Sequence, residues 1–131
     1  MSAAKPHTVL VAEDDDDLRD VITVILEEHG YTVATAHHGL EALDEVRRRM
    51  PDLILLDMKM PCMSGWEFAE RYRAAYPAPH QRAPLVIVSA AEHVSARAEE
   101  VSAAGYLAKP FTREELLSEV RLRLRGREAR R

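Results

Sequence analysis

Four short apolar runs, each followed directly by polar residues, constrain the fold of this chain more than any other feature. Apolar runs this short, set between helix-like stretches, are typical of buried parallel strands. Ligands of open α/β sheets bind outside the carboxyl ends of such strands. The runs are Val9–Ala12 before Glu13 and Asp14, Leu53–Leu56 before Asp57, Leu85–Val88 before Ser89, and Tyr106–Ala108 before Lys109 and Pro110. We therefore expect three acids, one hydroxyl and one ammonium group to meet at one edge of one sheet.

The segments between the runs have the spacing of amphipathic helices. Helices are predicted over 17–29, from Gly39 to Pro51, from Ser64 to Pro77, over 92–103 and from Thr112 onward, with a further strand over 32–36. The faces expected inside carry Leu18, Val21, Ile22, Ile25 and Leu26 in the first helix, Leu40, Leu43, Val46 and Met50 in the second, and only Val94, Ala98 and Val101 in the fourth. Strand and helix thus alternate five times, which predicts an α/β fold: a doubly wound, five-stranded parallel sheet with helices on both sides.

Length and composition indicate one cytoplasmic domain. The chain has 131 residues, enough for one compact core, and 47% of them are hydrophobic. Its single cysteine, Cys62, rules out an internal disulfide and fits a reducing compartment. The formal net charge of -4 argues against a nucleic-acid-binding surface over the whole domain. No apolar stretch before the first acids is long enough for a signal peptide or a membrane span.

The polar residues at the strand ends suit phosphoryl chemistry with magnesium. Glu13, Asp14 and Asp57 offer the hard oxygen ligands that Mg²⁺ prefers, and clustered carboxylates repel one another unless a cation joins them. A carboxylate is also a nucleophile that forms an acyl phosphate. Lys109 offers a mobile point charge to phosphoryl oxygens and Ser89 offers one hydroxyl donor. The set predicts a site for a divalent cation and a phosphoryl group.

Each of these features has a plainer interpretation when taken alone. The acid run from Glu13 to Asp17 is also what a solvated helix start looks like, because the helix dipole favours negative charge there. An Asp after a strand is often a cap or turn residue. His37 and His38 do not share a helix face and have no further ligand at zinc-like spacing, which argues against a metal site there. The joint placement of the four motifs at strand ends is what favours the functional interpretation.

The ordered motifs resemble those of one family, the receiver domain of two-component response regulators, which has a flavodoxin-like (βα)5 fold. The motifs are the acid pair in 9–15, the phosphoacceptor-like segment 52–65 with Met60 and Pro61, the Ser/Thr segment 87–90, and the Lys-Pro segment 106–111. The resemblance runs from about His7 to Arg125. It implies an N-terminal extension over 1–6, a receiver domain over 7–125 and a basic tail over 126–131.

The resemblance implies a role for each site residue. Asp57 would be the carboxylate that accepts a phosphoryl group. Glu13, Asp14 and Asp57 would bind Mg²⁺ together with the backbone carbonyl of Lys59. Ser89 and Lys109 would bind the phosphoryl oxygens.

The same resemblance implies a conformational switch. Tyr106 would turn inward as Ser89 is drawn to the phosphoryl group, and the Lys109–Pro110 peptide would be cis. Two positions depart from the family pattern: Ser102 stands where the family usually has Gly, and Lys59 places a long cation two residues past Asp57.

The function implied is a phosphorylation-dependent switch that accepts its phosphoryl group from a histidine kinase or phosphotransfer protein and acts on an output protein. It would not be an enzyme beyond self-phosphorylation and autodephosphorylation, and would be a monomer or weak homodimer. Two alternatives stay open: an Mg²⁺-dependent phosphatase with Asp57 as nucleophile, and an interaction module independent of phosphorylation. Many aspartyl-phosphate hydrolases carry an acid two residues after the nucleophile, where this chain has Lys59. The chain would also fit an excised piece of a longer regulator, and neither the kinase nor the output partner can be read from it.

Overall fold

Five parallel strands form one sheet in the order β2-β1-β3-β4-β5. The computed structural model describes residues 6–90 and 92–129. The strands are β1 (Thr8–Ala12), β2 (Thr32–Ala36), β3 (Leu53–Asp57), β4 (Leu85–Ala90) and β5 (Gly105–Lys109). This is the doubly wound, flavodoxin-like sheet that the alternating pattern predicts, and all its strands end at the same edge.

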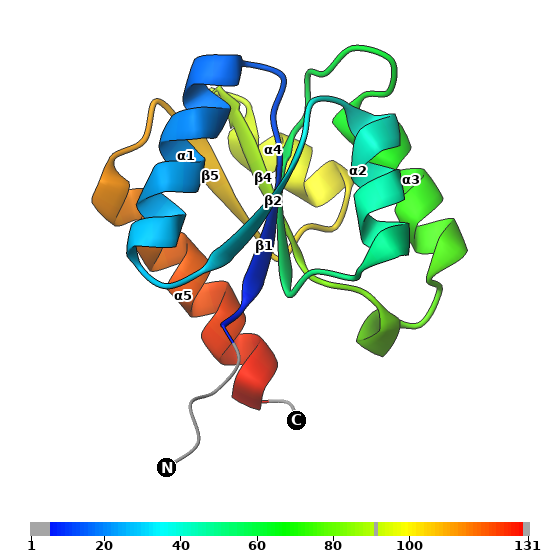
Figure 1. Cartoon of the computed structure of the whole chain (residues 1–131). Coiled ribbons are helices and arrows are strands. Elements are labelled where there is room, and N and C mark those ends of the chain that lie inside the picture. The colour runs from blue at the N-terminus through cyan, green and yellow to red at the C-terminus, as the bar shows by residue number, and fades with distance from the viewer. Residues whose placement is uncertain (1–5, 91, 130–131) are drawn as a thin grey trace.

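Five α-helices cover the two faces of the sheet (Figure 1). They are α1 (Asp16–Glu28), α2 (Gly39–Arg48), α3 (Gly65–Ala75), α4 (Val94–Glu100) and α5 (Arg113–Ala129), and a 3-10 turn, η1 (Pro79–Gln81), lies between α3 and β4. Helices α1 and α5 pack on one face, and α2, α3 and α4 on the other. Among the described residues, no helix has both the length and the apolar composition that a bilayer span requires.

The central strand β3 divides the core between the two faces. Leu53 and Leu55 belong to the cluster under α1 and α5, while Ile54 and Leu56 belong to the cluster under α2, α3 and α4. All five residues of β3 are buried, because successive side chains of a strand point to opposite faces and both faces are covered. Each such Leu or Ile stabilises the fold by about 1.5–3 kcal/mol. Asp57 is therefore carried by the best-anchored strand.

Ser64 with Glu67, and Thr112 with Glu115, have the sequence spacing of a capping box, which predicts a helix start, and both boxes form. The Ser64 side chain accepts from the Glu67 backbone N–H, while the Glu67 carboxylate accepts from the Ser64 backbone N–H, both at 3.2 Å. Thr112 and Glu115 form the same reciprocal pair at the start of α5. These bonds satisfy backbone donors that a helix leaves open in its first turn.

Two apolar residues predicted inside are exposed. Val21 of α1 is 53% exposed, because the buried stripe of that helix runs along Ile22, Ile25 and Leu26 and Val21 lies on its flank. Leu40 of α2 is 45% exposed. Leu40 lies nearly opposite the buried Ala42, because residues two positions apart in a helix are separated by about 200° around the helix axis.

The fourth helix is shorter than the predicted span of 92–103. It begins only at Val94, and the N-cap residue His93 makes no side-chain capping bond. It ends before Ser102, whose φ of 51° is left-handed and cannot continue a right-handed helix. The three residues expected on its inner face, Val94, Ala98 and Val101, are buried.

The predicted N-terminal extension and C-terminal tail fall partly on residues that the structure does not describe. Residues 1–5 of the expected extension and residues 130–131 of the expected tail lie outside the described residues. Helix α5 continues past Arg125 to Ala129, so residues 126–129 of the expected tail belong to the helix.

Candidate functional site

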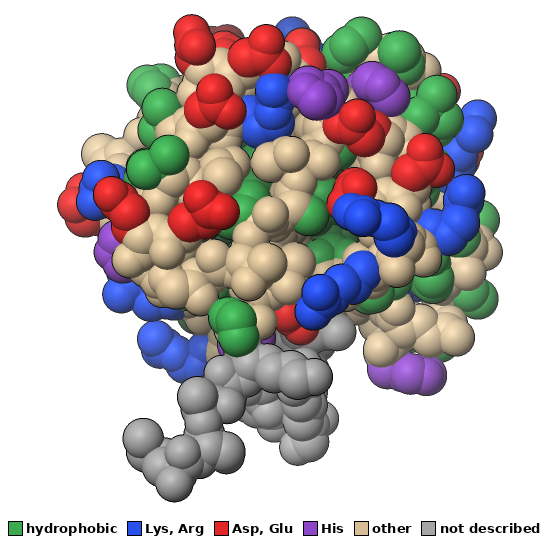
Figure 2. Space-filling model, viewed as in Figure 1, with side chains coloured by type: hydrophobic (Ala, Val, Ile, Leu, Met, Phe, Trp, Pro, Cys, Tyr) green, Lys and Arg blue, Asp and Glu red, His purple; other side chains and the backbone are tan. Residues whose placement is uncertain are grey.

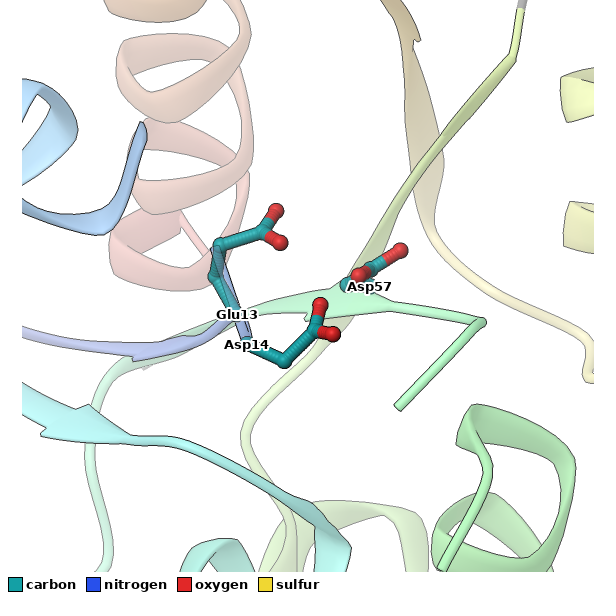
Figure 3. Close-up of side chains that lie close together, drawn as sticks. All are labelled: Glu13, Asp14 and Asp57. Atoms are coloured by element: carbon teal, nitrogen blue, oxygen red, sulfur yellow. The ribbon is translucent and has the colours of Figure 1, made fainter. Parts of the chain in front are cut away.

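Three carboxylates converge at the carboxyl ends of two neighbouring strands (Figure 3). Glu13 and Asp14 follow β1 directly, and Asp57 is the last residue of β3. Parallel pairing of Ala12 with Leu56 sets these ends side by side, and each acid offers an oxygen within 4.8 Å of the other two. Glu13 is 2% exposed and Asp57 6% exposed, whereas Asp14 is open to solvent. Within the described residues, this is the one group of three potential metal ligands.

Lys109 brings a cation to the two buried acids. Its Nζ lies 3.0 Å from Glu13 Oε1 and 3.6 Å from Asp57 Oδ1. Burial acts to lower the pKa of Lys109, but the charges of Asp57 and Glu13 raise that pKa above its usual value. Lys109 therefore stays charged at neutral pH.

The carboxyl of Asp57 is costly to ionise. Burial and then the charge of Glu13 raise the pKa of Asp57 from 3.8 to about 7, against the opposing effect of Lys109. The Lys59 backbone N–H donates to Asp57 Oδ1 at 3.3 Å, which favours the ionised form. Three acids and one ammonium group leave an excess of negative charge.

The donor set fits a magnesium ion. The groups that converge are carboxylate oxygens, which are hard ligands, and the exposed Asp14 leaves one side open to water and to phosphoryl oxygens. A divalent cation would offset the repulsion among the three acids.

Ser89 lies at the same edge of the sheet, whereas Tyr106 lies three residues before the end of β5. Asp57 pairs in register with Val88, so Ser89 is one residue past the position across from Asp57. Among the described residues, the half-buried Ser89 hydroxyl makes no hydrogen bond to the acids. Tyr106 of β5 is 49% exposed, with its ring outside the core. The Lys109–Pro110 peptide is cis, as the resemblance implies.

Two polar contacts were not predicted from the sequence, one beside the site and one at the carboxyl end of α4. Arg19 of α1 is buried and donates to the backbone carbonyl of Glu13. It lies three residues before Ile22 and seven before Leu26, on the buried side of the helix, and this spacing is a signal that could have identified it. Arg73 of α3 donates to the carbonyl oxygens of Val101 and Ser102, and no sequence pattern indicates that contact.

His37 and His38 have structural partners. His37 Nδ1 lies 2.8 Å from Glu41 Oε1, and His38 Nδ1 accepts from the Glu41 backbone N–H at the start of α2. Both residues lie directly before α2 and bond to its first turn.

A separate hollow of about 550 Å³ lies beside β2, among residues that include Thr32, Thr35, Arg48 and Arg49. Figure 2 is viewed as Figure 1, with β2 toward the viewer, and basic side chains (Lys and Arg) gather on the right of this face. Glu45 is the one acid along its wall and is paired with Arg48 at 2.7 Å. The hollow therefore has no acid cluster, and the ends of β1 and β3 are the stronger candidate site.

Comparisons with known proteins agree with this geometry. The family model described as the response regulator receiver domain matches residues 9–121. The response regulator MprA of Mycobacterium avium is 36% identical over 119 residues, which is 89% of this chain and 50% of that protein. The chain thus spans about half the length of the curated relatives it matches.

Solved structures give the same result. A structure described as a response regulator of Chloroflexus aurantiacus has a TM-score of 0.83 at 32% identity and covers 92% of this chain and 99% of that one. The chemotaxis response regulator CheY4 of Vibrio cholerae has a TM-score of 0.80 at 30% identity and covers 90% of this chain and 98% of that one. A match of this extent, on a parallel sheet whose strand ends carry the acid cluster and its lysine, shows that the chain belongs to the response regulator receiver domain family.

Proposed function

We propose that this receiver domain is a phosphorylation-dependent switch in which Asp57 accepts a phosphoryl group from a histidine kinase or phosphotransfer protein. The observation that carries the proposal is the place of Asp57 at the end of the buried strand β3. There the Lys109 ammonium lies 3.6 Å from the Asp57 carboxylate, and two further acids lie within 4.8 Å. The relatives of this chain are about twice its length, so the identity of the output protein is part of the proposal and not of the comparison.

The chemistry assigns a step to each group. An Asp57 carboxylate oxygen attacks phosphorus, a new O–P bond forms, and the bond from phosphorus to the donor breaks with its electron pair. The Lys109 ammonium then binds a phosphoryl oxygen in place of part of its contact with Asp57. The Ser89 hydroxyl donates to another oxygen.

Glu13, Asp14, Asp57 and the Lys59 backbone carbonyl are the groups that would hold Mg²⁺. Bound there, the ion would neutralise charge that develops on the phosphoryl oxygens. The chain's own contribution is to fix the acids in place and to keep Asp57 largely dry.

The switch follows from Ser89 and Tyr106. Movement of Ser89 toward the phosphoryl group opens space behind it, and the outward Tyr106 ring turns in to fill that space. The surface formed by α4, β5 and α5 then changes shape. Phosphorylation need favour the inward state by only a few kcal/mol to dominate the population.

The alternatives are weaker on specific grounds. A phosphatase would use the position two residues after Asp57 for acid catalysis, and this chain has an exposed lysine, Lys59, there. A module independent of phosphorylation would have no need to keep a carboxylate buried at the cost of a raised pKa. We place the domain in the cytoplasm, as a monomer or weak homodimer. Its own catalytic activity would be limited to self-phosphorylation and autodephosphorylation.

Intact-mass measurement tests the acceptor. Incubated with Mg²⁺ and acetyl phosphate, the wild type should gain one phosphoryl group and Asp57→Asn none, while Asp14→Asn should react much more slowly. Equal phosphorylation of Asp57→Asn would refute the assignment. Repeated turnover of p-nitrophenyl phosphate by the wild type would favour the phosphatase instead.

A further inference from the structure

Arg19 is a buried cation that the phosphoryl chemistry does not use. It is 7% exposed and lies in the first half of α1, and among the described residues its hydrogen bond to the acid cluster goes to Glu13. Its Nη1 donates to the backbone carbonyl oxygen of Glu13 at 2.9 Å, in a buried hydrogen bond. Its Nη2 lies 2.5 Å from Oδ1 of the exposed Asp16. A buried arginine is uncommon unless it is paired, and one of its two partners here is the backbone of the site itself.

The carbonyl that Arg19 holds belongs to the peptide between Glu13 and Asp14. A peptide is planar, so fixing its oxygen also fixes the direction in which the Asp14 backbone leaves it. The Glu13 N–H is already held by the Ala36 carbonyl at 3.0 Å. The contact with Arg19 therefore restrains the backbone on the carbonyl side of Glu13, where the chain continues into Asp14.

Asp14 itself has no other restraint of this kind. Among the described residues, its side chain makes no hydrogen bond, and it is exposed. The next residue, Asp15, is fixed because its side chain accepts from the Leu18 N–H at 3.0 Å and its own N–H donates to Glu13 Oε2 at 3.2 Å. The position of the Asp14 carboxylate thus depends on the backbone at either side of it.

We propose that Arg19 is a positioning residue for the magnesium site: by holding the Glu13–Asp14 peptide it orients the Asp14 carboxylate and thereby raises the affinity for Mg²⁺. This inference rests on the proposed function, since it takes Asp14 to be a metal ligand. Groups that orient metal ligands without touching the metal commonly change affinity by 10- to 100-fold.

Electrostatics alone predicts the opposite sign. Arg19 carries a positive charge close to the acid cluster, so removing it would strengthen Mg²⁺ binding if charge were its main effect. Asp16 offsets only part of that charge, because its side chain is 76% exposed. The direction of the change in affinity therefore separates positioning from charge.

The test is a titration of the metal-free protein with MgCl₂ near neutral pH, followed by calorimetry and by the amide NMR shifts of residues 13–15. Arg19→Met should weaken Mg²⁺ binding about tenfold and shift the Asp14 amide even before metal is added. Arg19→Lys should recover part of the affinity, because its ammonium group donates to the same carbonyl. Arg19→Gln is a second neutral variant, for use if the apolar methionine prevents folding. Asp16→Asn is the matched control: it removes the charge of the other partner of the guanidinium group, and it should change the affinity by less than about twofold.

Unchanged or stronger Mg²⁺ binding by Arg19→Met, with or without a lower melting temperature, would overturn the inference. Asp14→Asn in the same titration tests the proposed function separately. If the wild type shows no saturable response, or one that survives in Asp14→Asn, the metal site assigned above is wrong. If the wild type binds through Asp14 and Arg19→Met binds equally well, only the role of Arg19 fails.

Discussion

The loop after β1 and the helix α4 border the same site, but they are held very differently. The loop is fixed on several sides: the Glu13 N–H, carbonyl and carboxylate are bonded to Ala36, Arg19 and Lys109 respectively. Helix α4 has only seven residues and no side-chain bond at its N-cap. Its polar anchors lie at its carboxyl end.

Those anchors come from α3. Arg73 donates to the carbonyl oxygens of Val101 and Ser102, and Trp66 Nε1 donates to Glu100 Oε1 at 2.9 Å. The amino end of α4 follows Ser89 closely along the chain, and among the described residues no side chain of α3 donates a hydrogen bond to it. The acids therefore follow a strand whose end is held by several polar contacts, whereas α4 has its side-chain polar contacts toward one end and should open more easily at the other.

The largest expected effect is on the pH dependence of stability, and it tests whether the loop after β1 holds Glu13 and Asp14 rigidly beside Asp57. A fixed loop cannot let the carboxylates separate, so the metal-free protein must bear their repulsion. The raised pKa of Asp57 means that the folded state binds more protons than the unfolded state between about pH 4 and about pH 7. The free energy of unfolding should therefore fall as pH rises through this range, and Asp57→Asn should remove a few kcal/mol of that fall.

Urea unfolding at pH 5 and pH 8, without metal, measures this slope in both proteins. Magnesium at pH 8 is the control, since it should restore stability to the wild type and little to Asp57→Asn. Parallel pH curves for the two proteins would mean that the loop relaxes, and the contrast with α4 would be lost.

A smaller effect is expected at the anchor of α4. Arg73→Met should lower the free energy of unfolding by about 1 kcal/mol, because two carbonyl oxygens lose a charged donor. Amide hydrogen exchange should quicken over 98–103 and stay unchanged in β1 and β3. Arg71→Met is the matched control, as Arg71 is an exposed arginine on the same helix. Equal exchange in both variants would show that α4 is held by its apolar face alone.

The smallest effect concerns the turn that ends α4. Ser102 has a φ of 51°, which glycine adopts at little cost, so Ser102→Gly should stabilise the fold by about 0.5 kcal/mol after the greater unfolded-state freedom of glycine is counted. Thermal unfolding measures the gain. Ser102→Ala keeps the Cβ and should show none; a similar gain from alanine would place the cause elsewhere than in the backbone.

Much of the fold follows from the sequence because its signals are local. The run Leu53–Leu56 predicts β3 since a strand buried on both faces needs apolar residues throughout, and Ser64 and Glu67 predict a helix start because both partners of the cap lie within one turn. Whether a side chain is exposed is harder to predict, because it depends on residues far away in the sequence. Val21 fits the helical stripe, yet whether a flank is covered depends on the neighbouring elements.

The acid cluster was predictable, but its supports were not. Strand ends that meet at one sheet edge bring Glu13 and Asp57 together whatever the details of packing. The contact from Trp66 to Glu100 joins residues 34 positions apart, and nothing in the chain pairs these two before the helices are packed. Arg19 is intermediate: its spacing marks the buried side of α1, while its charge suggests the surface.

The edge position of β5 has a consequence for the order in which the protein becomes competent during synthesis. Chains emerge from the amino terminus, so β1 and β3 can pair and bring the acids together before β5 has been made. Lys109, the cation between Glu13 and Asp57, arrives only when this last strand adds to β4. Until β5 has been added, a nascent chain would hold the Asp57 carboxylate without the Lys109 ammonium group. Under the proposed function, phosphoryl transfer would gain the help of Lys109 only after this strand has joined the sheet.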